Sequence, residues 1–395
     1  MARTTAREWT PAWIRVTAVA AAAAFLVGAC SSDDSASTTT TAPRPTDESV
    51  TMNELQFIGT HNSYKSAPSA ELVDFLKGVV GPDAAGSELD PAQLAYGHRP
   101  LTQQLDSGIR SFELDVWADP TGGRFSDPLA VKVLAQPSPT GTDEPGFKVL
   151  HIQEIDYLST CPTLVGCLQE MVAWSDAHPD HLPITVNLEL KSDPLPSPFD
   201  VTPIQPFDAA TLDALDADLR TTLGDRLITP DEVRGSAPDL RSAVTDPAAG
   251  GGWPSVEDSR GRFLLFMDNG GELAERYLAG HPSLQERVLF TSDGFDRDDA
   301  AVLKVNDPGD GTEIESLVQE GFLVRTRADA DVAAPGADKD VALASGAQMV
   351  HTDFPVGEAQ AGTGYVVSFP TPVQARCNPV NTTPTTCSPK VAAEP

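Results

Sequence analysis

The stretch SFELDVW at residues 111–117 is a run of aliphatic and aromatic residues that carries two carboxylates. Glu113 and Asp115 are two positions apart, so in an extended strand both side chains point to the same face. Similar runs recur along the chain, and several are continuously apolar, as expected of parallel strands covered on both faces. The predicted strands are 55–59, 111–117, 148–152, 184–190, 263–268, either 288–291 or 301–305, 322–326 and 347–352.

Helical patterns separate these runs. Leucine and other apolar residues at 164, 167, 168, 171 and 172 have the spacing of a buried helix stripe, and so do the leucines at 212, 215, 219 and 223, with Gly224 placed to cap that helix. Eight strands with helices between them over roughly 300 residues predict an α/β fold, a (β/α)₈ TIM-type barrel. The Pro/Gly-rich stretch 229–260 is expected to be a long loop and to make the barrel irregular. The barrel domain is predicted to span 50–369, followed by a surface extension over 370–395.

The N-terminus has the pattern of an export signal. Three arginines precede a 14-residue apolar stretch, VTAVAAAAAFLVGA, which is too short to span a bilayer as a helix. The sequence Val27-Gly28-Ala29-Cys30 resembles a bacterial lipobox, in which Cys30 is lipidated; ordinary secretion with cleavage nearby is the alternative. Residues 1–30 are therefore predicted to be a lipoprotein signal that leaves the protein on the cell surface, anchored to its own bacterial membrane. Residues 31–49 are predicted to be a flexible Ser/Thr/Pro linker.

Charge and cysteine content narrow the possible partners. The chain has 27 basic and 57 acidic residues, a formal charge of −30, which argues against nucleic acid and against docking on anionic membranes, and is compatible with cation binding.

Four cysteines remain after Cys30, an even number in an exported protein, so disulfides are permitted. Proximity in sequence predicts the pairs Cys161–Cys167 and Cys377–Cys387, and no His or Cys spacing supports the rival interpretation, a zinc site. We expect a monomer.

Polar residues gather where the predicted strands end. In a barrel of this kind the carboxyl ends of the strands converge on one face, which carries the active site. A lone histidine at a strand end is usually structural, and a Glu-x-Asp pair is usually solvated, but the joint pattern is more specific than any of its members. The residues concerned are His61, Asn62, Glu113, Asp115, His151, Asn187, Glu189, Lys191, Asp268, Arg325, Arg327 and Asp353.

The carboxylates indicate a metal. Glu113 and Asp115 would face the barrel interior, where unpaired carboxylates are costly. Arg or Lys from other strands could compensate them, but a hard divalent cation does so with fewer constraints. Asn62, Glu113, Asp115 and Glu189 form an all-oxygen ligand set, which suits Ca²⁺ better than Mg²⁺.

These same segments resemble a known family. FIGTHNSY, IRSFELDVW, VLHIQEID, ITVNLELK, VRTRAD and SGAQMVHTDFP, which cover most of residues 53–356, are similar to the phosphatidylinositol-specific phospholipase C superfamily and specifically to its calcium-dependent bacterial branch. The resemblance implies that His61 and His151 are the catalytic pair and that Asn62, Glu113, Asp115 and Glu189 bind calcium. It also implies cleavage of the glycerol–phosphate bond of phosphatidylinositol by a vicinal inositol hydroxyl, giving diacylglycerol and inositol (cyclic) phosphate.

Individual roles follow from the chemistry of that reaction. We expect His151 to protonate the departing glycerol oxygen and His61 to donate to a non-bridging phosphate oxygen. Lys191 and Arg325 are predicted to contact substrate, and we expect only one of Arg325 and Arg327 to face inward. Asp353 is expected to fix the final turn, His98 is a weaker substrate candidate, and His351 is expected to be a polar core residue.

Two other functions are considered. Glycerophosphodiester phosphodiesterases are neighbouring barrel enzymes that typically begin with His-Arg-Gly, whereas this chain has His61-Asn62-Ser63. A non-catalytic binding lipoprotein would be expected to have lost a site residue, and all six predicted catalytic and metal residues are present. The predicted substrate is therefore a phosphoinositide or another phosphodiester lipid.

Overall fold

The computed structural model describes residues 46, 48–79, 89–192 and 202–394. The predicted signal segment, Cys30 and the first part of the predicted linker lie outside these residues. Within the described part of the chain, no helix has the length and apolar character needed to cross a membrane.

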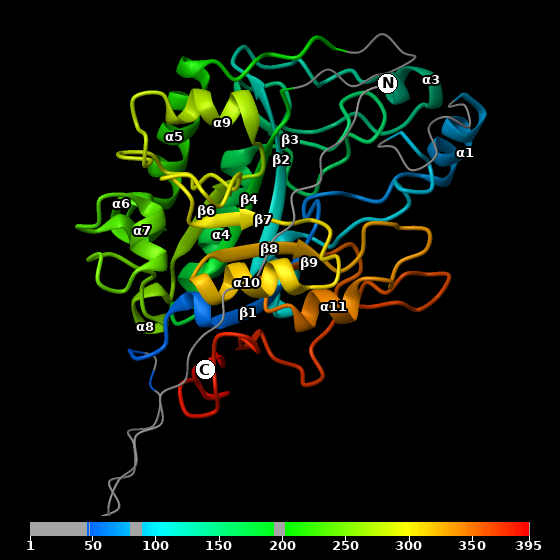
Figure 1. The fold of residues 1–395 in the computed structure, drawn as a ribbon. Coiled ribbons are helices and arrows are strands. Elements are labelled where there is room, and N and C mark those ends of the chain that lie inside the picture. The colour runs from blue at the N-terminus through cyan, green and yellow to red at the C-terminus, as the bar shows by residue number, and fades with distance from the viewer. Residues whose placement is uncertain (1–45, 47, 80–88, 193–201, 395) are drawn as a thin grey trace, which may run out of the picture. The chain divides into compact units, whose positions relative to one another are not determined.

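A curled parallel sheet forms the centre of the fold (Figure 1). Its strand order is β5-β6-β4-β2-β1-β9-β8-β7, and neighbouring strands are parallel. The strands are β1 Leu55–Thr60, β2 Ser111–Asp119, β4 Ile184–Leu190, β5 Leu227–Ile228, β6 Phe263–Met267, β7 Val302–Lys304, β8 Leu323–Arg327 and β9 Met349–Thr352. Seven of the predicted runs coincide with these strands, and β5 was not predicted.

The two ends of this sheet are joined by a segment that forms no regular strand. Phe290 N donates to Leu265 O (3.0 Å), and Met267 N donates to Phe290 O (2.8 Å). On the other side, Lys304 N donates to Ser292 O (3.1 Å). Residues 288–292 thus lie between β6 and β7, so both of the runs between which the sequence left a choice take part in the barrel. The irregular TIM-type barrel is confirmed.

The prediction that the third strand, 148–152, belongs to the parallel barrel sheet is wrong. β3, Gly146–Val149, pairs antiparallel with β2 rather than joining the parallel sheet, and it ends before His151. A short apolar run does not reveal the direction in which a strand pairs, so the sequence pattern could not separate the two arrangements. His151 consequently lies in the segment 150–163 that follows β3, not at the end of a barrel strand.

Helices pack around the outside of the sheet, as α10 does over β8 (Figure 1). The two predicted stripes are confirmed: α4 begins after its N-cap Thr163, which accepts from Gly166 N, and α5 ends at Gly224, whose φ of 54° suits glycine. The predicted long loop 229–260 instead contains three short helices, α6, α7 and α8. The helices are α1 Ala70–Val79, α2 Leu101–Asp106, α3 Leu129–Leu134, α4 Leu164–Ala177, α5 Ala209–Leu223, α6 Pro230–Arg234, α7 Leu240–Thr245, α8 Val256–Ser259, α9 Gly271–Leu278, α10 Thr312–Glu320 and α11 Lys339–Ala344, with 3₁₀ turns at Met52–Glu54 and Gly224–Arg226.

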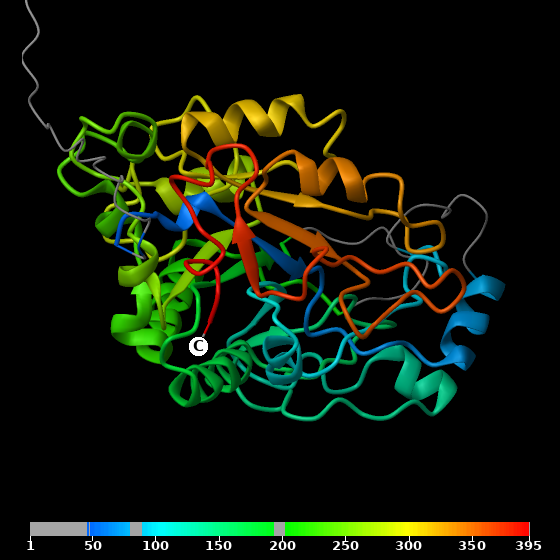
Figure 2. The same cartoon turned by 90° about the horizontal axis from the view of Figure 1, so that it is seen from below.

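The C-terminal extension lies beside the start of β1 (Figure 2), whereas His61 follows the other end of that strand. Its strand β10, Ala375–Cys377, pairs antiparallel with residues 55–57 at the start of β1. Both predicted disulfides, Cys161–Cys167 and Cys377–Cys387, are present. Near the end of the chain, Glu394 forms an ion pair with the buried Arg110 and accepts from Leu182 N (2.8 Å).

We expect Glu394→Gln to lower the free energy of unfolding by about 1–3 kcal/mol, because the buried Arg110 guanidinium loses its charged partner. Burial alone would raise the pKa of Glu394, but Arg110 holds it below its usual value. The contribution is therefore present at neutral pH and lost as the pH falls through that lowered pKa. Urea unfolding at pH 7 measures the difference, with Glu257→Gln at an exposed position as the control. Equal stability of the two variants would show that the pair contributes nothing.

Candidate active site

The turn after β1 places two predicted site residues at the mouth of the barrel. His61 N donates to Thr352 O of β9 (3.1 Å), so the chain leaves β1 beside the end of its neighbour. Asn62 has a positive φ of 48°, a conformation that asparagine tolerates better than most residues. Ser63 fixes the turn to β2, because its N donates to Glu113 O (3.0 Å) and its Oγ accepts from Glu113 N (2.8 Å).

The His61 ring is held by a carboxylate. Its Nδ1 lies 2.7 Å from Asp353 Oδ1, and Asp353 Oδ2 accepts from Arg327 Nη2 (2.8 Å). Burial and then the Arg327 charge lower the pKa of His61, against the opposing effect of Asp353. Arg327 also brings the pKa of Asp353 to about 2, although burial alone would raise it. A neutral His61 whose Nδ1–H donates to the Asp353 carboxylate therefore keeps Nε2 available as an acceptor.

The contact between Asp353 and His61 was missed in the sequence, where Asp353 was expected only to fix the final turn. A usable signal was present in the strand order. Because β1 and β9 are adjacent and parallel, with Thr60 opposite Thr352, the residues that follow these two strands become neighbours.

His151 has a carboxylate partner of its own. Its Nδ1 lies 2.7 Å from Asp156 Oδ2, five residues along the same segment. Asp156 is buried, and Lys65 Nζ lies 3.3 Å from the same oxygen. Both histidines line a single cavity of about 490 Å³, a size typical of small-molecule sites.

Three carboxylates converge beside this cavity. Glu113 and Asp115 on β2 are buried, and Glu189 on β4 lies directly opposite Asp115 in the strand register. One oxygen from each of the three lies within 4.8 Å of the others. Glu113 Oε1 is 3.6 Å from His61 Nε2, and Glu189 lines the same cavity as both histidines. The sequence thus predicted a cluster that the fold does bring together.

Two basic side chains partly neutralise the cluster. Lys191 Nζ lies 2.9 Å from Asp115 Oδ2 and 2.7 Å from Glu189 Oε1. On the other side, Arg325 is hydrogen-bonded to Glu113 Oε2. Burial would raise the pKa of Glu113, but Arg325 holds it well below its usual value, whereas burial raises the pKa of Asp115 well above its usual value in spite of Lys191. Of the two carboxylates on β2, Asp115 is therefore the one whose charge is less well compensated.

The cluster fits a calcium ion. Its donors are all oxygens, the ligands that Ca²⁺ prefers. Asp115 Oδ1 is buried, and no side chain or backbone group among the described residues gives it a hydrogen bond. Asn62 lines the same cavity, and its carboxamide oxygen accepts from Tyr64 OH (3.3 Å). Glu113, Asp115 and Glu189 could hold the ion together, and Asn62 remains a predicted fourth ligand.

The two arginines of β8 correct one expectation. Residues two apart in a strand share a face, so the expectation that only one of Arg325 and Arg327 points inward is wrong. Arg325 is 1% exposed and does not line the cavity. Its guanidinium is hydrogen-bonded to Glu113 and Asn306, which leaves it poorly placed to bind substrate. Arg327 lines the cavity, and so does Lys191. The structure therefore favours Arg327 over Arg325 as a substrate contact.

Two other histidines near the site have structural contacts. His98 Nε2 lies 2.9 Å from His61 O and its Nδ1 lies 2.6 Å from Glu358 Oε2, so it supports the turn rather than facing the cavity. His351 is fully buried, 2.7 Å from Ser111 Oγ. A Cβ at Gly59 would lie 2.5 Å from this ring, so the glycine of β1 makes room for it.

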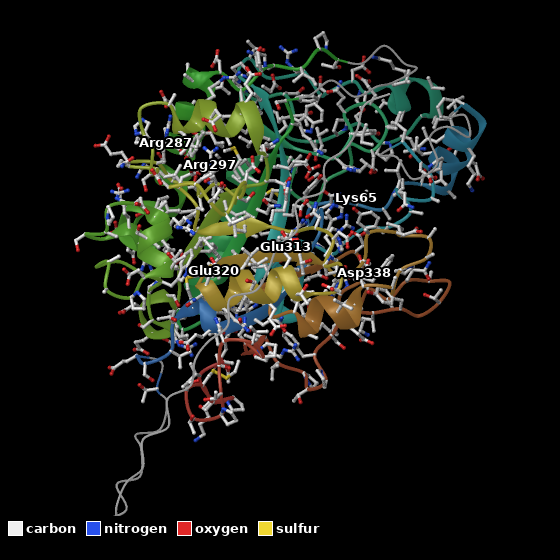
Figure 3. The ribbon with its side chains drawn as sticks, in the orientation of Figure 1. Lys65, Arg287, Arg297, Glu313, Glu320 and Asp338 are labelled. Atoms are coloured by element: carbon white, nitrogen blue, oxygen red, sulfur yellow. A yellow bond between two sulfur atoms is a disulfide. The ribbon has the colours of Figure 1, made fainter. Side chains whose placement is uncertain are left out.

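Two loops, which lie outside the quoted family segments except for Asp329, complete the cavity. Residues 93–96 form one wall, and the segment after β8, over 329–338, forms another. This second wall carries the carboxylates of Asp329, Asp331 and Asp338, the last of which is labelled in Figure 3. Burial and the nearby Asp353 raise the pKa of Asp329 to about 6.

Comparison with known proteins identifies the family. The model of the Ca²⁺-dependent phosphoinositide phospholipase C family matches residues 50–379. The chain belongs to this family. The protein is thus a phosphodiesterase of the phospholipase C type, and calcium is the cofactor of its family. The family match favours this function over the glycerophosphodiester phosphodiesterase alternative.

Solved structures agree with the fold. A Ca²⁺-dependent phosphatidylinositol-specific phospholipase C from Streptomyces antibioticus is 19% identical, with a TM-score of 0.50 over 77% of this chain and 95% of that one. A calcium-dependent phosphoinositol-specific phospholipase C from a Pseudomonas species is 16% identical, with a TM-score of 0.51 over 81% of this chain and 96% of that one. A comparison with curated proteins returns no match.

Proposed function

We propose that this phospholipase C cleaves the glycerol–phosphate bond of phosphatidylinositol by attack of the adjacent inositol hydroxyl, releasing diacylglycerol and an inositol cyclic phosphate. The observation that carries the proposal is the shared cavity. Two histidines, each held by a buried carboxylate, line the same space as Glu189, Lys191 and Arg327. That arrangement supplies two proton-transferring groups and several phosphate-binding groups together.

Each protein group has a part in this reaction. His61 Nε2 accepts the proton of the attacking hydroxyl, because its Nδ1 is bonded to Asp353 and its lowered pKa leaves the ring neutral. This differs from the role expected from sequence, a donor to phosphate. A calcium ion, which Asn62, Glu113, Asp115 and Glu189 would hold, would lower the pKa of the hydroxyl and offset phosphate charge. Arg327 binds a non-bridging phosphate oxygen, and His151 gives its proton to the departing glycerol oxygen.

The experiment that tests the function is turnover of dispersed phosphatidylinositol in a calcium titration, with EGTA as the blank and phosphorus NMR of the products. We expect calcium-dependent release of diacylglycerol together with a cyclic phosphodiester signal. Turnover of glycerophosphoinositol or glycerophosphocholine, without cleavage of the lipid, would overturn the proposal in favour of a glycerophosphodiester phosphodiesterase.

We expect Lys191→Met to raise the affinity for calcium at least about tenfold, a change of about 1.4 kcal/mol. The Lys191 ammonium lies between Asp115 and Glu189, two of the proposed ligands, and so competes with the ion for the same oxygens. Isothermal titration of the metal-free protein with calcium measures the affinity. Lys304→Met is the matched control, because Lys304 pairs with Asp268 at residues that do not line the cavity. An unchanged or weaker affinity in Lys191→Met would contradict the competition.

The predicted lipid anchor at Cys30 remains a proposal. The two disulfides support export, since such bonds persist in oxidising compartments. An anchored enzyme would act on lipid within reach of its linker, on the outer side of the membrane.

A further inference from the structure

Lys65, which is labelled in Figure 3, is a buried lysine whose contacts lead toward both proposed catalytic histidines. Its side chain is fully buried, and its Nζ donates to Leu94 O (2.8 Å) and Tyr96 O (2.7 Å). The same Nζ is 3.3 Å from Asp156 Oδ2 and lies over the Tyr96 ring, 4.4 Å from its centre. An ammonium group without water needs such partners, because burying a charge is costly unless it is paired.

On one side, Lys65 reaches His151 through Asp156. The Asp156 oxygen that faces Lys65 is also the oxygen 2.7 Å from His151 Nδ1. A carboxylate at Nδ1 keeps a proton on that nitrogen and turns the other nitrogen, Nε2, away from it. Lys65 in turn restrains the carboxylate.

On the other side, Lys65 reaches His61 through Tyr96. Tyr96 O accepts from Lys65, while Tyr96 OH lies 3.1 Å from His61 Nδ1 and accepts from Asn62 Nδ2 (2.8 Å). Leu94 and Tyr96 both line the cavity. The Lys65 ammonium therefore contacts both Asp156, the carboxylate partner of His151, and Tyr96, whose hydroxyl lies beside His61.

We propose that Lys65 and Asp156 form a positioning pair that sets the tautomer and orientation of His151 relative to the cavity wall at Leu94 and Tyr96. The inference rests on the proposed function, in which His151 is the acid. Neither residue lines the cavity, so both act through their neighbours. Stability alone does not account for the pair, because buried ion pairs are often no more stabilising than apolar residues of the same size.

The chain contains a matched pair outside the site. Lys148 is also fully buried, 3.4 Å from Asp119 Oδ2, and its Nζ also donates to two backbone carbonyls, those of Glu144 and Gly146. This pair ties β3 to β2 and contacts neither His61 nor His151. Asp119→Asn therefore imposes a comparable structural change without touching the machinery.

The test compares Asp156→Asn with Asp119→Asn, both as full-length protein. We expect Asp156→Asn to lower kcat on phosphatidylinositol about 10–100-fold, with KM and calcium affinity within twofold of wild type. We expect Asp119→Asn to keep kcat within twofold. Nitrogen-15 NMR of the imidazoles should show loss of the single His151 tautomer with the Nδ1 proton in Asp156→Asn only.

Wild-type kcat in Asp156→Asn, equal losses in both variants, or an unchanged His151 tautomer would each overturn the proposal. Lys65→Met, paired with Lys148→Met, is the second comparison and should lower kcat in the Lys65 variant only, because Asp156 then loses the contact that restrains it. If the wild-type protein does not cleave phosphatidylinositol, the proposed function fails, while the NMR comparison still decides whether the pair positions His151.

Discussion

His151→Gln is expected to lower kcat on phosphatidylinositol about 10²–10⁴-fold while the protein stays folded and still binds calcium. Glutamine retains polarity but cannot deliver a proton to the departing glycerol oxygen. The His151 side chain is 11% exposed and its Nδ1 is hydrogen-bonded to Asp156 on the same segment, so we expect the change to leave the barrel strands in place. Steady-state kinetics measures the effect, and thermal unfolding with and without calcium confirms the fold.

The role of His151 as an acid can be separated from a binding role. An aryl ester of inositol phosphate has a leaving group that departs without protonation, so His151→Gln should lose much less activity on that substrate than on the lipid. His178→Gln, at an exposed position after α4, is the control and should behave as wild type on both. Equal losses on the two substrates would contradict proton donation by His151.

The second large effect is expected at the metal site, where Asp115→Asn should abolish most of the calcium response. Calcium at 100 times its Kd stabilises a protein by about 2.7 kcal/mol, so wild type should unfold at a higher temperature with calcium than with EGTA. The variant lacks a charged ligand and should show little shift. Its activity should fall with the affinity, because the metal supplies several kcal/mol of transition-state stabilisation in such sites.

Without calcium, Asp115→Asn is expected to stabilise the folded protein instead of weakening it. Burial raises the pKa of Asp115 above its unfolded value, so the folded protein loses stability as the pH rises from the unfolded pKa through the raised one. At pH 7 in EGTA, Asp115→Asn should therefore unfold at a higher temperature than wild type.

Asp216→Asn provides the comparison, since Asp216 is also buried with a raised pKa but pairs with Tyr277 and Arg287 away from the cavity. That variant should keep the full calcium shift. An equal calcium shift in Asp115→Asn would remove Asp115 from the ligand set.

The parallel strands and the metal-capable carboxylates were predictable because both depend on local pattern. Glu113 and Asp115 share a face through the strand period, and parallel strands bring their carboxyl ends together, which places Glu189 opposite Asp115. The site residues His61 and Asn62 follow β1 for the same reason. The strand period alone places Glu113 and Asp115 on one face, whereas the position of Glu189 also depends on β2 and β4 being neighbours.

The remaining features depend on contacts between distant segments. The pairing of Asp353 with His61 joins residues 292 positions apart, and it follows only once β1 and β9 are known to be neighbours. The antiparallel direction of β3 could not be predicted from its short apolar run, because that run does not indicate how the strand pairs. Lys65 reads in sequence as an ordinary polar residue after a turn, and only the fold buries its ammonium against Asp156.

The two histidines are attached to the molecule in different ways. His61 follows a strand inside the continuous barrel, whereas His151 and Asp156 lie on the segment that leaves the antiparallel strand β3. The Cys161–Cys167 bond fastens the far end of that segment to α4. A reducing thiol would break the Cys161–Cys167 disulfide. We expect the His151 segment to become more mobile, while His61 keeps its position. Purification buffers for this enzyme should accordingly omit dithiothreitol, and material made in a reducing cytosol should be reoxidised before its turnover is judged.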